Sequence, residues 1–434
     1  MRKANLMPLL GDGTRGPNST ILPSAVCQGA LTWLLLGLLL MLNGPAQAQI
    51  RPNPLRQMLR HDTVGLGRVL AHPGRYRLQI LYTEIRRDAA GTPHFRRYGY
   101  RLRPREYFYP ASTVKLAAAA LALEKLRALA TQVPGLSPEA IMLTDSAFAG
   151  QTRVRRDSSS ASGRPTLANY VRKALLVSDN DAFNRLYEFV GPAELNAGLV
   201  RLGLRDSRLQ HRLAVGDQEP GSRHTNLVAF YADTAATQLL YKQPAAHYGG
   251  PWPQLRLRGE GVGKSHVQGT QVVAGPLDFR QKNAFSLPDL QRMLQAVLFP
   301  ESLPPAQRLR LAPDDYALLR QALSQAPRES PSPRYDVAHY PDTYAKFLLG
   351  GGGQVPLPPG VRVFNKIGQA YGFLIDNAYV QDQANGVEFM LSAVLYVNAD
   401  GVLNDDRYEY DSIGFPFLRD LGRRVYEAER RKQR

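Results

Sequence analysis

Residues 107–130 read YFYPASTVKLAAAALALEKLRALA, and this segment decides how the rest of the chain is interpreted. Alanine and leucine dominate residues 113–130, which predicts a long helix beginning just after Pro110. Ser112 and Lys115 stand at positions i and i+3, so their side chains can meet on one face of that helix. A serine hydroxyl needs an adjacent base to act as a nucleophile, and a desolvated lysine can be that base. Free N–H groups at the helix N-terminus favour a developing oxyanion.

The flanking segments predict the elements around this helix. Strand signals occur twice before it and three times near the C-terminal end, with helical spacing between and after these groups. The predicted strands are residues 76–85, 97–102, 361–367, 372–381 and 387–397, and the predicted helices are 113–130, 166–177, one starting at Asp181, 287–298 and 418–430. This order predicts a mixed α/β fold, in which an antiparallel five-stranded sheet from both chain ends packs with a helical subdomain.

Two tripeptides elsewhere carry further candidate chemistry. Ser178-Asp179-Asn180 stands in a break between two predicted helices, where its hydroxyl can relay a proton and its amide can hold a substrate carbonyl. Asp179 can fix that loop by accepting backbone N–H bonds, as in an ordinary helix cap. Lys366-Ile367-Gly368 lies within a predicted strand. Its lysine adds positive charge beside a cleft, and its glycine lets a substrate approach the strand closely. Neither tripeptide is specific when taken alone.

Taken together and in this order, the motifs resemble the S-x-x-K, S-D-N and K-T-G set of serine β-lactamases and penicillin-binding proteins. The segments 107–116 (YFYPASTVKL) and 176–184 (LVSDNDAFN) resemble the nucleophile and second-motif segments of the class A β-lactamases. The resemblance covers roughly residues 75–430. It implies the β-lactamase/transpeptidase-like fold and a serine hydrolase that acts through an acyl-serine intermediate.

The resemblance also implies roles for individual residues in acyl transfer. Ser112 would form the acyl-enzyme and Lys115 would accept its proton. Ser178 would pass a proton toward the leaving nitrogen. The backbone N–H groups of Ser112 and Gln369 would form the oxyanion hole, in which the loss of one donor typically costs about 10²–10³ in rate.

For substrate binding, the resemblance implies that Asn180 holds the amide side chain of the substrate. Lys366 would attract a substrate carboxylate. The expected substrate is a β-lactam, another small amide or a peptidoglycan-like molecule, and neither a cofactor nor a metal ion is expected. The histidines at 211, 224, 247 and 266 lack metal-ligand spacing and are expected to lie at the surface.

Two departures from the family pattern leave alternatives open. Ile367 stands where the family usually has threonine or serine, so a carboxylate-binding hydroxyl is missing. The region 208–223 offers Glu219 as a deacylating base, but the register around Arg212 and Leu213 would place no acid there. The alternatives are a D,D-peptidase or penicillin-binding-type hydrolase with slow deacylation, and a non-catalytic envelope binding protein that retains the fold.

Residues 1–48 are expected to form an export leader. A basic start is followed by an apolar run at 31–42 and by Ala46-Gln47-Ala48, a small-residue cleavage site. Cleavage would make the protein periplasmic or secreted, whereas an uncleaved leader would be an N-terminal membrane anchor. Residues 49–75 would then form an approach segment before a catalytic domain at 76–434. The single cysteine, Cys27, excludes an intramolecular disulfide.

The formal charge of +17 indicates either attraction to an anionic envelope surface or a generally basic proteome. Its arginines are scattered without a nucleic-acid-binding pattern, so we expect no nucleic-acid partner. Two segments, at about 211–282 and 300–360, lack regular periodicity. This predicts surface insertions and linkers there, including a flexible connector at residues 350–353. The oligomeric state stays open.

Overall fold

The computed structural model describes residues 53–60, 65–216 and 220–432. The predicted leader and Glu219 therefore lie outside the described residues. Within these ranges, no helix combines the length and apolar character that a membrane crossing requires.

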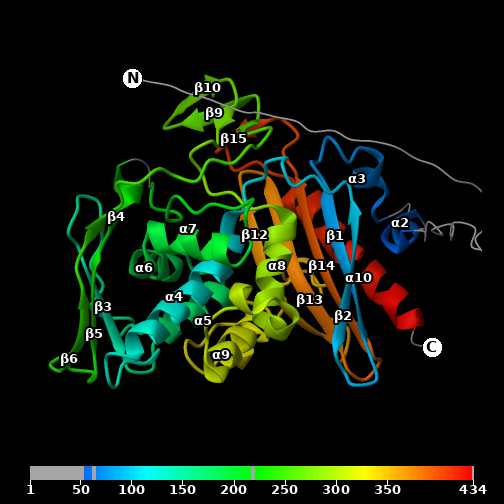
Figure 1. The fold of residues 1–434 in the computed structure, drawn as a ribbon. Helices are drawn as coiled ribbons and strands as arrows, with labels where there is room; N and C mark the ends of the chain where they lie inside the picture. Colours follow the sequence, from blue (N-terminus) through cyan, green and yellow to red (C-terminus); the bar gives the residue numbers. More distant parts are fainter. Residues whose placement is uncertain (1–52, 61–64, 217–219, 433–434) are drawn as a thin grey trace, which may run out of the picture. The chain divides into compact units, whose positions relative to one another are not determined.

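The central sheet joins both ends of the described chain (Figure 1). Its strand order is β12-β13-β14-β1-β2, and every neighbouring pair is antiparallel. The two ends meet where β1 pairs with β14, with Ile80 opposite Ala393. The strands are β1 (Gln79–Arg87), β2 (Pro93–Tyr100), β12 (Arg362–Ala370), β13 (Phe373–Asp382) and β14 (Val387–Tyr396). The prediction of a mixed α/β fold with a five-stranded antiparallel sheet is confirmed.

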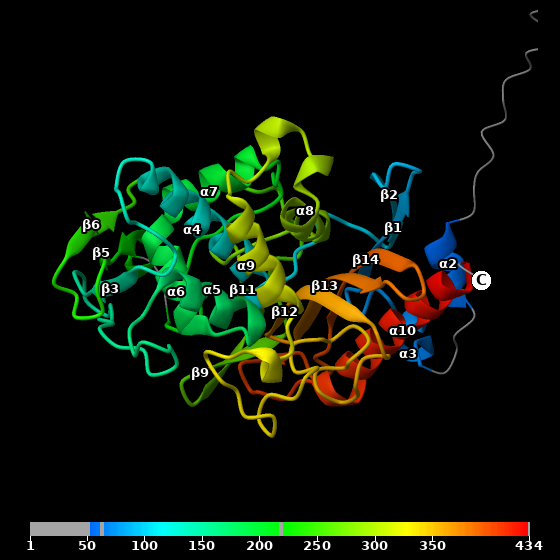
Figure 2. The same cartoon turned by 90° about the horizontal axis from the view of Figure 1, so that it is seen from below.

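Helices cover both faces of this sheet (Figure 2). On one face, α10 (Phe415–Lys432) packs on β14 and on α2 (Pro54–Arg60), near the short α3 (Gly67–Ala71). On the other face, α8 (Leu287–Leu298) contacts β1, β13 and β14. Since both faces are covered, the central strands β13 and β14 are apolar along most of their length rather than alternating.

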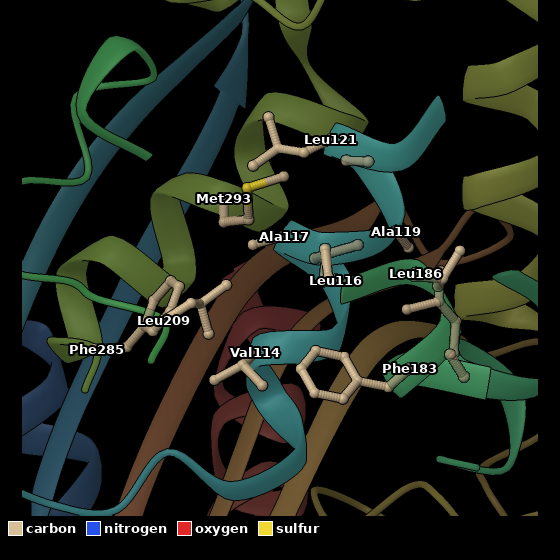
Figure 3. Packing of buried hydrophobic residues seen from close by; sticks show 14 of the residues in the cluster. Val114, Leu116, Ala117, Ala119, Leu121, Phe183, Leu186, Leu209, Phe285 and Met293 are labelled. Atoms are coloured by element: carbon tan, nitrogen blue, oxygen red, sulfur yellow. The ribbon is translucent and has the colours of Figure 1, made fainter. Parts of the chain in front are cut away.

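The helical subdomain is built around α4 (Lys115–Ala130). Its alanine run, residues 117–120, is almost completely buried, and these small side chains let neighbouring helices approach closely. Figure 3 shows α4 packed against Phe183 and Leu186 of α6 and against Met293 of α8. The other helices of the subdomain are α5 (Leu167–Leu176), α6 (Asn180–Val190), α7 (Pro192–Arg201) and α9 (Pro313–Ser324).

The segment 211–282 contains short strands that the sequence did not indicate. β5 (Leu227–Tyr231) pairs with β3 (Ile141–Asp145) and β6 (Leu239–Gln243) in a separate three-stranded sheet. A second small sheet joins β9 (Ser265–Gln268), β10 (Gln271–Ala274) and β15 (Val402–Leu403). The remaining short strands are β4 (His224–Thr225), β7 (Ala246–His247), β8 (Gly261–Val262) and β11 (Leu277–Asp278).

The segment 300–360 is not a surface linker throughout. It contains α9, and Phe347, Leu348 and Leu349 are buried in the core beneath α10. The expected flexible connector is also packed, because a Cβ atom at Gly350 would lie 2.6 Å from the Lys346 carbonyl oxygen. This part of the prediction was wrong because glycines that permit close packing and glycines of a linker look alike in a sequence.

Candidate active site

Ser112 lies in a tight turn that leads into α4. A 3₁₀ turn covers Ala111–Val114, and the regular helix starts at Lys115, later than the sequence predicted. This turn packs directly against β12. The contact needs Gly368, since a Cβ atom there would lie 2.6 Å from the Pro110 carbonyl oxygen. Gly368 was expected to admit substrate; in the structure it admits the nucleophile turn.

We expect Gly368→Ala to destabilise the fold by about 1–3 kcal/mol, because the added methyl group must push β12 away from the Ser112 turn. The shift should also slow any reaction at Ser112. Urea denaturation measures the first effect. Gly67→Ala is the matched control, since a Cβ atom there meets nothing within 4 Å. Equal stability of the two variants would contradict the packing role of Gly368.

Lys115 is completely buried beneath this turn. Its Nζ donates hydrogen bonds to Asn180 Oδ1 at 2.7 Å, to Ser178 Oγ at 3.1 Å and to the Ser178 carbonyl oxygen. Burial lowers the pKa of Lys115 to about 7, and the charge of Asp179 opposes that shift. A large share of the amine is therefore neutral near pH 7, as a general base requires.

Ser178 connects two buried lysines. It has the left-handed φ of 64° in the break between α5 and α6, and Asp179 caps α6 by accepting from the Ala182 N–H. Lys366 Nζ donates to Ser178 Oγ at 2.9 Å and to the Ile367 carbonyl oxygen at 3.1 Å. Burial, followed by the charge of Lys115, lowers the pKa of Lys366 well below its usual value. The three sequence motifs thus form one connected hydrogen-bond network.

The hydroxyl of Ser112 stands outside that network. Among the described residues, no hydrogen bond joins Ser112 Oγ to Lys115 Nζ, although both lie at the start of α4. Ser112 instead lines a cleft of about 580 Å³ together with Asn180 and Gln369. The other lining residues are Tyr109, Ala111, Leu213, Ala214, Ala370, Tyr371, Asn404, Asp406, Tyr408 and Tyr410.

Ile367 does not line this cleft. Its side chain is buried on the far face of the sheet, in the cluster that also contains Leu374 and Phe415. Its bulk therefore does not narrow the cleft. A hydroxyl at that position would also face away from the cleft, so Ile367 does not change the cleft lining.

The wall formed by the segment after α7 carries apolar side chains. Leu213 and Ala214 line the cleft, and Asn184 holds Leu213 by accepting from its N–H at 2.8 Å and donating to its carbonyl oxygen at 2.9 Å. In the described part of the chain, Asp406 is the one carboxylate that lines the cleft. Glu219 lies outside the described residues, so its role as a deacylating base stays a prediction.

His211 is not at the surface, contrary to expectation. It is buried and its ring lies parallel to that of Tyr109, with 6.3 Å between the centroids. Its Nδ1 lies 2.6 Å from the Arg212 carbonyl oxygen. Its role is to support the cleft wall. Within the described ranges, no group of three or more His, Cys, Asp or Glu side chains is arranged to hold a metal ion.

The sequence did not indicate the opposite wall of the cleft. Tyr371 follows β12, and Asn404, Asp406, Tyr408 and Tyr410 come from a segment near the C-terminal end. That segment has no motif, and contacts with distant residues, such as the pairing of β15 with β9, bring it to the cleft. A second cavity of about 480 Å³ adjoins the first, and the two share Tyr371 and Asn404.

The fold and the three linked motifs define a serine enzyme of the penicillin-recognising kind. In agreement, the model of the β-lactamase enzyme family matches residues 95–428, and the chain belongs to that family. No curated protein matches the sequence.

Solved structures of three β-lactamases are similar to the chain. Those from Desulfarculus baarsii and Streptosporangium roseum are each 19% identical, with TM-scores of 0.45 and 0.44. The match covers 85% of this chain and 96% of the first structure, and 86% of this chain and 98% of the second. The β-lactamase from Sphaerobacter thermophilus is 16% identical with a TM-score of 0.44, and the match covers 85% of this chain and 97% of that one.

Proposed function

We propose that the chain is an exported serine hydrolase that attacks a β-lactam or a related amide through an acyl intermediate on Ser112. The observation that supports this most is the Ser178 hydroxyl, which bridges buried Lys115 and Lys366 beside the cleft that Ser112 lines. Family membership supports the reaction class. The apolar run and small-residue site within residues 1–48 support export.

In the proposed reaction, neutral Lys115 removes the proton from Ser112, and Oγ forms a bond to the substrate carbonyl carbon. The N–H groups of Ser112 and Gln369 stabilise the resulting oxyanion. The C–N bond then breaks, and Lys115 passes the proton taken from Ser112 through the Ser178 hydroxyl to the leaving nitrogen, which leaves Lys115 neutral again. Water finally hydrolyses the acyl-serine ester and restores the free hydroxyl.

A fluorescent penicillin provides the direct test. The wild-type protein should carry one covalent label, and Ser112→Ala should carry none. Ser324→Ala, which lies on α9, is the matched control and should label like the wild type. Equal labelling of the Ser112→Ala variant, or no labelling of a folded wild type, would exclude the proposed nucleophile. The second outcome would favour a non-catalytic binding protein.

A slowly deacylating D,D-peptidase-type enzyme is the second candidate. It is favoured by the apolar Leu213 and Ala214 in the cleft wall and by the adjoining cavity, which leaves room for a larger amide. Sustained turnover of nitrocefin would support the β-lactamase function. A single burst followed by stable label, with cleavage of a D-Ala-D-Ala peptide, would support the peptidase.

A further inference from the structure

The cleft around Ser112 has an unusual composition for a chain of this charge. Although the formal charge is +17, no Lys, Arg or His side chain appears among the described residues that line the cleft. The lining includes four tyrosines and the carboxylate of Asp406. Lys366, which would attract a substrate carboxylate, is buried beneath Ser178 instead. The described lining of this cleft is therefore aromatic with one negative charge, whereas Lys282 lines the adjoining cavity.

Asp406 is available to a ligand. Its side chain is exposed, and in the described part of the chain it accepts no hydrogen bond and forms no ion pair. Its neighbours differ, because Asp405 accepts from the Arg407 N–H at 3.0 Å and Glu409 accepts from the Ala399 N–H at 3.1 Å. Asp405 and Glu409 therefore stabilise the loop through backbone hydrogen bonds, whereas Asp406 lines the cleft.

The loop that carries Asp406 is held in place from several sides. The Asn404 N–H donates to Tyr408 Oη at 2.9 Å, and the Gly372 N–H donates to Tyr410 Oη at 2.8 Å. Asn404 Nδ2 also donates to the Val267 carbonyl oxygen of β9 at 3.3 Å. Asn404 and Asp406 both adopt left-handed backbone angles, with φ of 62° and 59°. Non-glycine residues keep such angles where surrounding contacts impose them, and these often mark ligand-binding segments.

A carboxylate beside several aromatic rings suits an ammonium group. The ammonium forms an ion pair with the carboxylate and is attracted to the negative faces of the rings. An anionic group at the same place would meet Asp406 without a compensating cation from the cleft lining. Asn180 lines the same cleft as Asp406, and the resemblance assigns its amide to the acyl side chain of the substrate.

We propose that Asp406, with the tyrosines of the cleft, selects substrates that carry a positively charged amine on the acyl side of the scissile amide. This inference rests on the proposed function for its substrate class. It concerns recognition, and it is therefore testable in a protein that cannot be acylated.

The test uses ampicillin and benzylpenicillin, which differ by one amino group on the acyl side chain. Their dissociation constants are measured by calorimetry on Ser112→Ala at low salt. We expect ampicillin to bind about fivefold more tightly, as for a partly exposed ion pair with an aromatic contribution. Adding Asp406→Asn should bring the ratio close to one. Adding Asp405→Asn, on the same loop, should leave the ratio unchanged, and high salt should reduce it.

Each outcome decides the inference. Equal affinity for the two penicillins, binding of neither, or a preference that survives Asp406→Asn would overturn it. The acylation of wild-type protein is measured separately by mass spectrometry. If the ampicillin preference depends on Asp406 but neither penicillin acylates the wild type, the proposed function fails and the recognition site stands.

Discussion

Lys115→Met is expected to lower the rate of acylation at Ser112 by about 10²–10⁴-fold, the usual contribution of a positioned general base. Methionine fills the buried space but offers no amine, so Asn180 Oδ1 loses this donor and Ser178 Oγ keeps only the donor from Lys366. The rate of labelling by an excess of fluorescent penicillin measures the effect. Lys125→Met on the same helix is the matched control, since Lys125 lies outside the cleft and pairs with Glu194.

Lys115, as the general base, also sets how the rate of acylation depends on pH. Because the neutral amine accepts the proton, acylation should rise with pH through about 7, the lowered pKa of Lys115, and level off above it. Below that pH the ammonium form predominates and the rate should fall tenfold per unit. A profile that stays flat from pH 8 down to pH 5 would show that another group takes the proton, as would near-normal labelling of Lys115→Met.

Glu188→Gln is expected to destabilise the protein by about 3–5 kcal/mol. Glu188 on α6 is buried between two arginines, with Arg185 Nη1 at 2.8 Å and Arg212 Nη1 at 2.9 Å. The substitution keeps the shape of the side chain but removes its negative charge from beside two buried guanidinium groups. Removing one partner of a buried ion pair costs far more free energy than the intact pair contributes to stability. The midpoint of urea denaturation measures the loss.

Glu194→Gln is the matched control for this prediction. Its ion pair with Lys125 spans 3.2 Å, but the Glu194 side chain is 60% exposed, so water screens the interaction. We expect a loss below about 1 kcal/mol. An equal loss of stability in both variants would show that the buried ion pair between Glu188 on α6 and Arg212, next to Leu213 in the cleft wall, does not stabilise the fold.

Local patterns in the sequence predicted the central sheet and the helices that flank it. The alanine-rich run after Ser112 and the apolar strands β13 and β14 carry their periodicity within one segment, so their structure is readable locally. The short strands at 224–278 and the packed glycines at 350–353 were missed. Their conformation depends on partners far away in the chain, such as the pairing of β9 with β15.

For the candidate site, the sequence by itself predicted Ser112, Lys115, Ser178 and Lys366, because each belongs to a short motif in a fixed order. Only the tertiary structure decided that Ser178 bridges both lysines, that Gly368 accommodates the turn of Ser112, and that tyrosines and Asp406 line the cleft. The physical reason is distance along the chain. A motif consists of residues close together in the sequence. The desolvation of a side chain, its contacts and the charge of a cleft depend on segments that come together only on folding.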